Sequence, residues 1–142
     1  MLGLAAVLAG GCGSGGHFAN DPRPPSPVNV TVYINDQRVS LSPSSVGAGP
    51  VVFIVTNQAS QAVSMRILQT GNAVPAARTG PITPQATAQI TVNLNRPQTT
   101  YKVVTSAKAA TEAAAATATP IQPALLHIGN QRASASNELQ AP

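Results

Sequence analysis

The sequence contains few charged and few aromatic residues. Charged residues make up 8% of its 142 residues, aromatic residues make up 3%, and tryptophan is absent. Soluble domains usually carry about 25% charged residues. A surface built from Ser, Thr, Asn and Gln instead favours a protein outside the cytoplasm over a cytosolic enzyme. The length is typical of one domain with tails.

Acidic residues are especially scarce, and basic residues are not clustered. The formal net charge is +4 and the pI is about 10.0. A nucleic-acid-binding face needs clustered cations that neutralise several phosphates together, so we expect no nucleic-acid partner. The eight basic residues stand singly: Arg23, Arg38, Arg66, Arg78, Arg96, Lys102, Lys108 and Arg132.

No constellation of catalytic residues is visible. The four acids, Asp21, Asp36, Glu112 and Glu138, lie far apart in turns and tails, so no pair suggests acid/base catalysis. A serine or threonine nucleophile needs a neighbouring base, and there is no G-x-S-x-G motif. We therefore expect that the protein is not an enzyme.

The chain has a single cysteine, Cys12. One cysteine excludes an intramolecular disulfide and any CxxC metal or redox motif. It follows the apolar run MLGLAAVLAGG, which has the pattern of a secretory signal sequence. That run is shorter than the roughly 20 apolar residues that span a bilayer.

The segment from Leu8 to Cys12, LAGGC, resembles the lipobox of bacterial lipoproteins. Gly10 and Gly11 are the small residues before the cleavage point, and Ala9 stands where the family usually has leucine. The resemblance implies that residues 1–11 are a signal peptide and that Cys12 is lipidated. The protein would then be anchored to the outer face of the cell membrane. Residues 12–27, rich in Gly, Ser and Pro, would form the tether.

From residue 28 onward apolar residues alternate with polar ones, the period of a β-strand. VNVTVYI and ATAQITVNL show the alternation best, and VVFIVTN fits a central strand. Residues 28–130 are therefore predicted to form one all-β domain, a sandwich or small barrel, followed by a polar tail over 131–142.

Residues 44–50 and 70–85 are predicted loops, the second with at most fragments of edge strand. The Ala-rich segment 107–119 is predicted to be a loop or a loosely held helical turn. The predicted strands are 28–34, 38–43, 51–57, 62–68, 86–94, 101–106 and 124–128.

The order of these segments resembles the cupredoxin-like fold over residues 28–106. VNVTVYI, the loop ending GAGP, and VVFIVTN are similar to the family's first strand, small-residue loop and central strand ending in asparagine. PITPQATAQITVNL and RPQTTYKVV are similar to its late strand and its strand that begins with tyrosine. The resemblance implies a cupredoxin-like Greek-key β-sandwich or barrel, here with an Ala-rich insertion before the last strand.

Copper-binding members of that family use a thiolate, two imidazoles and a weak axial thioether. Here QASQAVSMRI, after Asn57, has no histidine, and Thr105 stands at the cysteine position. We therefore expect no cofactor and a metal-free binding or accessory module, whose partner could be a cell-envelope protein or a polymer. The alternative is copper binding or electron transfer through an atypical set of Met65, His127 and His17. We interpret Met65 as a core residue and His127 as a partly buried or rim histidine.

Overall fold

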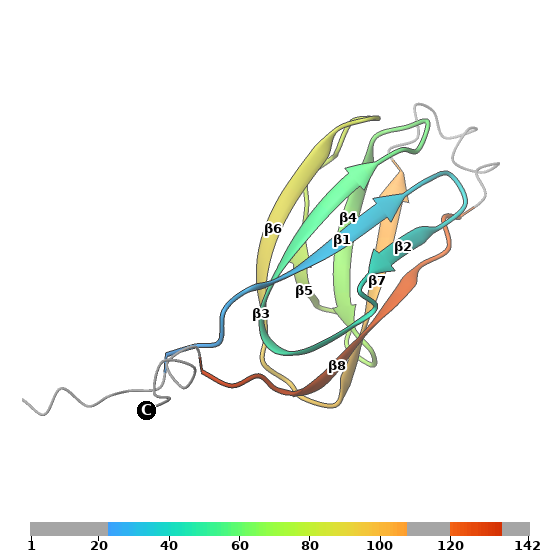
Figure 1. The fold of residues 1–142 in the computed structure, drawn as a ribbon. Helices are drawn as coiled ribbons and strands as arrows, with labels where there is room; N and C mark the ends of the chain where they lie inside the picture. The colour runs from blue at the N-terminus through green and yellow to red at the C-terminus, as the bar shows by residue number, and fades with distance from the viewer. Residues whose placement is uncertain (1–22, 108–119, 135–142) are drawn as a thin grey trace, which may run out of the picture.

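The computed structural model describes residues 23–107 and 120–134, which form eight β-strands (Figure 1). No helix in this part of the chain is long and apolar enough to cross a membrane. Cys12, His17 and residues 108–119 of the predicted Ala-rich loop lie outside the described residues, and Ala107, the first residue of that predicted loop, instead ends a strand. The strands are β1 (Val28–Ile34), β2 (Val39–Ser42), β3 (Ser45–Asn57), β4 (Val63–Gln69), β5 (Pro75–Arg78), β6 (Thr87–Leu94), β7 (Thr99–Ala107) and β8 (Ala124–Gln131).

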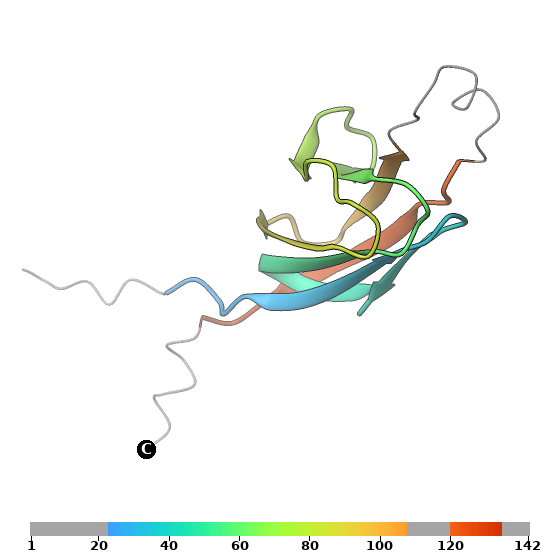
Figure 2. The same cartoon turned by 90° about the horizontal axis from the view of Figure 1, so that it is seen from above.

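The strands form two layers that share β3. The first sheet has the order β2-β1-β3-β6, and the second continues from β3 as β8-β7-β4-β5. β3 pairs in parallel with β1 and with β8, and all other named pairs are antiparallel. The view in Figure 2 shows the two layers facing each other. The prediction of an all-β fold is confirmed.

The core lies between the layers and is built from the inward residues of each alternating strand. On β1, Val30, Val32 and Ile34 are completely buried, whereas the intervening Thr31 and Tyr33 are exposed. Phe53 on β3 is among the largest fully buried side chains. Branched aliphatic residues therefore fill most of the interior, as the alternation predicts.

Residues 44–50 differ from the prediction, because most of this expected loop belongs to β3. Val46 and Ala48 are buried, and β3 pairs with β8 through residues 45–48 before it pairs with β1 and β6. The strand changes sheets at Gly47 and Gly49, where the pairing with β8 is irregular and Gly49 has a φ of 139°. Only glycine adopts such a backbone readily. The two glycines mark a transition between sheets within one strand, and they do not end it.

Two further elements refine the predicted boundaries. β5 is a short edge strand within residues 70–85, in the segment where only edge fragments were predicted. β8 begins at the predicted residue and continues to Gln131. Arg132, the next residue, is then held against the start of β3 by its side chain.

Candidate functional site

One end of the sandwich gathers the loops that follow β1, β3 and β5, and we call it the upper end (Figure 1). Its centre is Asn57, the last residue of β3. Among the described residues, Asn57 is the one buried residue with a polar side chain. Asn57 Nδ2 donates to the carbonyls of Gln61 at 2.9 Å and Ile82 at 2.8 Å, and its Oδ1 accepts from Ala59 N at 2.9 Å. A single buried amide therefore fixes the loops 58–62 and 79–86 against each other.

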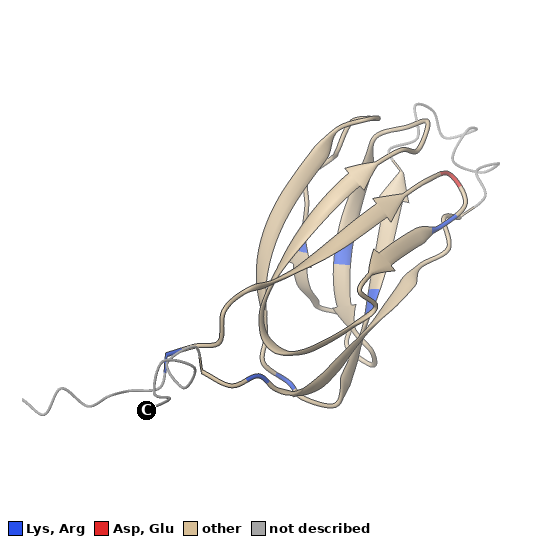
Figure 3. Cartoon of the chain, in the orientation of Figure 1, with Lys and Arg blue, Asp and Glu red and all other residues tan. Residues whose placement is uncertain are grey.

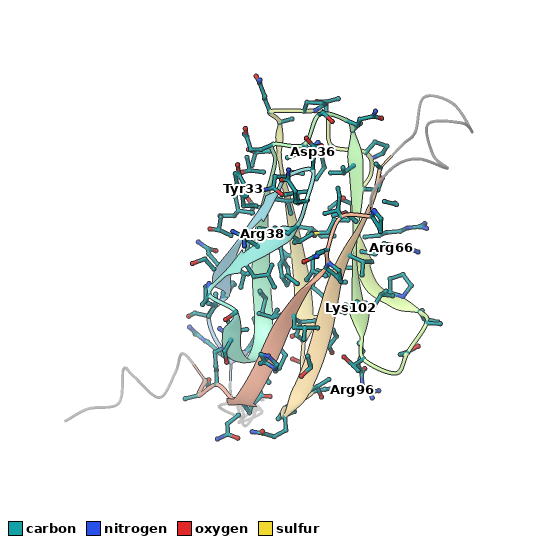
Figure 4. The ribbon with its side chains drawn as sticks, turned by 90° about the vertical axis from the view of Figure 1, so that its right-hand side faces the viewer. Tyr33, Asp36, Arg38, Arg66, Arg96 and Lys102 are labelled. Atoms are coloured by element: carbon teal, nitrogen blue, oxygen red, sulfur yellow. The ribbon has the colours of Figure 1, made fainter. Side chains whose placement is uncertain are left out.

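A second link joins the loop after β1 to the loop after β3. Asp36 Oδ1 accepts hydrogen bonds from Ser60 N at 2.8 Å and from Ser60 Oγ at 2.9 Å. Asn35 Oδ1 closes the β1–β2 turn by accepting from the backbone N–H groups of Gln37 and Arg38. The upper end is consequently a set of loops pinned by short polar side chains. Tyr33, Asp36 and Arg38 are labelled in this region in Figure 4.

Thr105 lies on β7 at the position where the cupredoxin resemblance places a cysteine. It is the direct cross-strand partner of Met65 on β4, which is completely buried. Thr105 Oγ1 is buried, and among the described residues it has no hydrogen-bond partner. A buried hydroxyl without a partner carries a desolvation cost. The Thr105 hydroxyl therefore adds no stabilising hydrogen bond within the described residues.

The side chains at this end do not fit a copper centre of the cupredoxin kind. That centre needs a thiolate and imidazoles converging on one point. Thr105 supplies only a hydroxyl, and the start of β4 supplies Val63 and Ser64. Within residues 23–107 and 120–134, no three His, Cys, Asp or Glu side chains lie close enough to hold one ion. We therefore derive no step through a metal.

The structure does not bring the two described members of the atypical set together. Met65 points into the core, whereas His127 on β8 is exposed, and its Nδ1 lies 3.1 Å from Thr100 Oγ1 on the outer face of the second sheet. Met65 and His127 thus lie on opposite faces of that sheet. His127 is exposed because it falls on the outward phase of β8, so of the two positions expected for it, partly buried or at the rim, it is not the partly buried one.

The opposite, lower end is organised by Arg132. Its Nε donates to the carbonyls of Gly47 at 3.1 Å and Ala48 at 3.4 Å, and its Nη atoms donate to the carbonyls of Ser26 and Pro50. Burial lowers the pKa of this guanidinium from its ordinary value, yet an arginine side chain remains charged in proteins. Arg132 therefore ties the segment that enters β1 to the start of β3 and the end of β8.

Local sequence patterns do not predict these polar contacts. Arg132 stands in a polar tail and has no charged neighbour in the chain, so nothing in its context predicts four carbonyl partners. The strand pattern predicts Asn57 only as the end of a strand. Its three backbone contacts depend on two loops, around residues 59–61 and 82, that fold back over it.

Comparison with solved structures finds similar chains at low sequence identity. The structure is similar to reduced auracyanin from the photosynthetic bacterium Roseiflexus castenholzii, with a TM-score of 0.48 and 14% identity over 74% of this chain and 98% of that chain. It is also similar to a laccase from Pediococcus acidilactici, with a TM-score of 0.47 and 11% identity over 76% of this chain and 30% of that one. A multicopper oxidase has a TM-score of 0.45 at 13% identity, over 75% of this chain and 46% of that chain.

These similarities concern the backbone and carry no information about copper in this chain. No protein-family model matches the sequence, and no curated protein matches it. The chain spans 30% of the laccase and 46% of the multicopper oxidase. By its strand pairing, the protein is an all-β, eight-stranded mixed sandwich in its described residues.

Proposed function

We propose that this protein is an extracytoplasmic lipoprotein whose β-domain is a metal-free binding or accessory module. The observation that carries the metal-free part is the pairing of Thr105 with Met65 in the interior, where a copper-binding relative would place its thiolate. A hydroxyl and a thioether do not form the thiolate–imidazole set that such a centre requires. The scaffold then serves to present surfaces and does not carry out redox chemistry.

The anchor part of the proposal rests on the lipobox-like segment that ends at Cys12. The sixteen residues from Cys12 to Pro27 could reach about 50 Å when fully extended. The segment before β1 enters the domain at the lower end, where Arg132 donates a hydrogen bond to the Ser26 carbonyl. An anchor at Cys12 would therefore leave the upper loops on the side away from the point of attachment.

The anchor is tested by mass spectrometry of the membrane fraction from cells that produce the full chain. We expect a mature protein that begins at Cys12 and carries the mass of attached lipid. Cys12→Ser should remove both the lipid and the membrane association. His17→Ser, which changes a residue of the same tether, should leave both intact. An unmodified Cys12 in the membrane fraction would contradict the anchor.

The metal-free part is tested separately by titrating the full chain with Cu(II) in a calorimeter. We expect no tight stoichiometric binding. Tight binding that is lost in His127→Ala and retained in His17→Ala would favour a copper site on β8 and would contradict the proposal. The anchor and the metal content are thus decided by independent measurements.

A further inference from the structure

The outer face of the second sheet carries two arginines that face each other across neighbouring strands. Arg66 on β4 and Arg78 on β5 are direct antiparallel partners, and both are exposed. Cα atoms of such partners lie about 4.5–5.5 Å apart. Figure 3 shows both strands marked blue side by side at this level. The two guanidinium groups therefore rise from one small area of the sheet.

This pair borders an open depression with a volume of about 750 Å³ at the end of β5. Ser64 and Ser106, which are cross-strand partners on β4 and β7, line it together with Thr79. The Thr79 Oγ1 already accepts a hydrogen bond from Met65 N at 3.0 Å, which leaves its proton free to donate. The depression thus combines two cations with three hydroxyl groups.

Like charges placed directly opposite each other on a sheet are unfavourable. Among residues 23–107 and 120–134 the one acidic side chain is Asp36, which binds Ser60 at the upper end. No ion pair or hydrogen bond to either guanidinium is present within those residues. Within the described residues the pair therefore has no counter-charge to relieve its repulsion, and an anion placed between the two groups would supply one.

A third cation extends the same face. Lys102 on β7 pairs with Leu68, two residues along β4 from Arg66, and it is exposed. From the strand spacing and rise, its Cα lies about 8 Å from that of Arg66. Figure 4 shows Arg66, Lys102 and Arg96 along one side of the molecule. Two anionic groups a short distance apart could thus be bound together.

We propose that Arg66 and Arg78 form a binding site for a phosphate group, and that Lys102 contributes a second contact when the ligand carries several phosphates. Each guanidinium offers a planar fork of donors that matches two oxygens of an oxyanion. A phosphate group carries up to about two negative charges and has at least three oxygens for the two forks and the nearby hydroxyls, whereas a carboxylate carries one charge and two oxygens. The site therefore favours phosphate over carboxylate, and it depends neither on the lipid anchor nor on the absence of a metal.

The test is calorimetric titration of the full chain with tripolyphosphate at fixed ionic strength. Inorganic phosphate and a longer polyphosphate serve as parallel probes that distinguish a single phosphate group from a polymer as the source. We expect Arg66→Gln and Arg78→Gln each to weaken tripolyphosphate binding about tenfold. Lys102→Gln should weaken tripolyphosphate binding but leave the weaker binding of inorganic phosphate unchanged.

The control is Arg38→Gln, which removes one exposed positive charge from the loop after β1. It should leave binding unchanged. An equal loss in Arg38→Gln and Arg66→Gln would mean attraction by net charge alone and would overturn the site. Equal binding of a polyglutamate of matched charge would overturn the preference for phosphate, and absence of tripolyphosphate binding would overturn the inference altogether. Circular dichroism of each variant verifies that a lost affinity does not come from unfolding.

Discussion

Arg132 packs directly against the backbone of Gly47 at the lower end of the sandwich. Arg132 Nε donates to the Gly47 carbonyl at 3.1 Å, and a Cβ added to Gly47 would lie 2.5 Å from Arg132 Cγ. Arg132 can therefore reach the backbone of β3 only because Gly47 has no side chain. The start of β3, the end of β8 and the entry to β1 meet through this contact.

Gly47→Ala and Gly49→Ala should both destabilise the protein. A Cβ at Gly47 displaces Arg132, and a Cβ at Gly49 lies 2.7 Å from Arg132 Nη2 and 2.8 Å from Pro25 Cγ, at a φ of 139°. We expect losses of about 1–3 kcal/mol in the free energy of unfolding, with Gly49→Ala the larger because backbone strain adds to the clash. Urea denaturation measures the difference.

The matched control is Gly80→Ala, where an added Cβ would have no neighbour within 4 Å. Its free energy of unfolding should stay within about 0.5 kcal/mol of the wild-type value. A comparable loss at Gly80 would mean that the effect comes from glycine replacement in general and not from crowding of Arg132.

Arg132→Gln should destabilise the lower end, because the shorter amide cannot reach the four carbonyls that the guanidinium binds. We expect a loss of about 2 kcal/mol in the free energy of unfolding. Arg132→Lys should be only partly tolerated, since one ammonium group lacks the planar fork of donors. Arg96→Gln, at an exposed turn, serves as the control for charge removal. Equal effects of the two Gln variants would contradict the role assigned to Arg132.

Asn57→Ala should be among the most harmful changes at the upper end. It removes three hydrogen bonds and leaves the N–H of Ala59 and the carbonyls of Gln61 and Ile82 without that partner. We expect a loss of about 3 kcal/mol in the free energy of unfolding. Hydrogen exchange should also show faster exchange of the Ala59 amide. Asn93→Ala, an exposed asparagine on β6, should change the stability by less than about 0.5 kcal/mol.

Thr105→Val should stabilise the protein by about 1 kcal/mol, because it replaces a buried hydroxyl without a described partner by a methyl group of similar size. Thr105→Ser keeps the hydroxyl and removes the methyl group, so it should destabilise. Thr91→Val, at an exposed position of β6, controls for the general effect of valine in a strand. Thermal and urea unfolding of the three variants measure these effects. Destabilisation by Thr105→Val would show that the hydroxyl has a partner.

Much of the strand pattern could be predicted because each strand has one buried face. β1 was predicted at its observed bounds, and β4, β6 and β7 within two residues at each end. Val30, Val32 and Ile34 repeat at the period of two that a half-buried strand requires. The prediction of a loop over residues 44–50 is wrong, because its glycines are typical of loops whereas here they lie within β3. The buried Val46 and Ala48 already alternate there, but their significance depends on β8, which is distant in the sequence.

The candidate sites were less predictable than the strands. Arg66 lies in a predicted strand, 62–68, whereas Arg78 lies in a segment rich in Gly and Pro, so no local pattern places the two side by side. The same holds for Thr105 and Met65, whose pairing depends on the register between β4 and β7. Register is fixed by the pairing of strands in space and is not visible in either strand alone.

The sequence by itself determined an all-β chain with an aliphatic interior, few charges and no thiol after residue 12, because these properties follow from composition and a period of two. Only the tertiary structure decided that β3 serves both sheets, that Arg132 binds the carbonyls on both sides of Gly47, and that Arg66 faces Arg78. Each of these relationships joins residues through space. Their geometry is set by the packing of the two layers, which local sequence patterns do not encode.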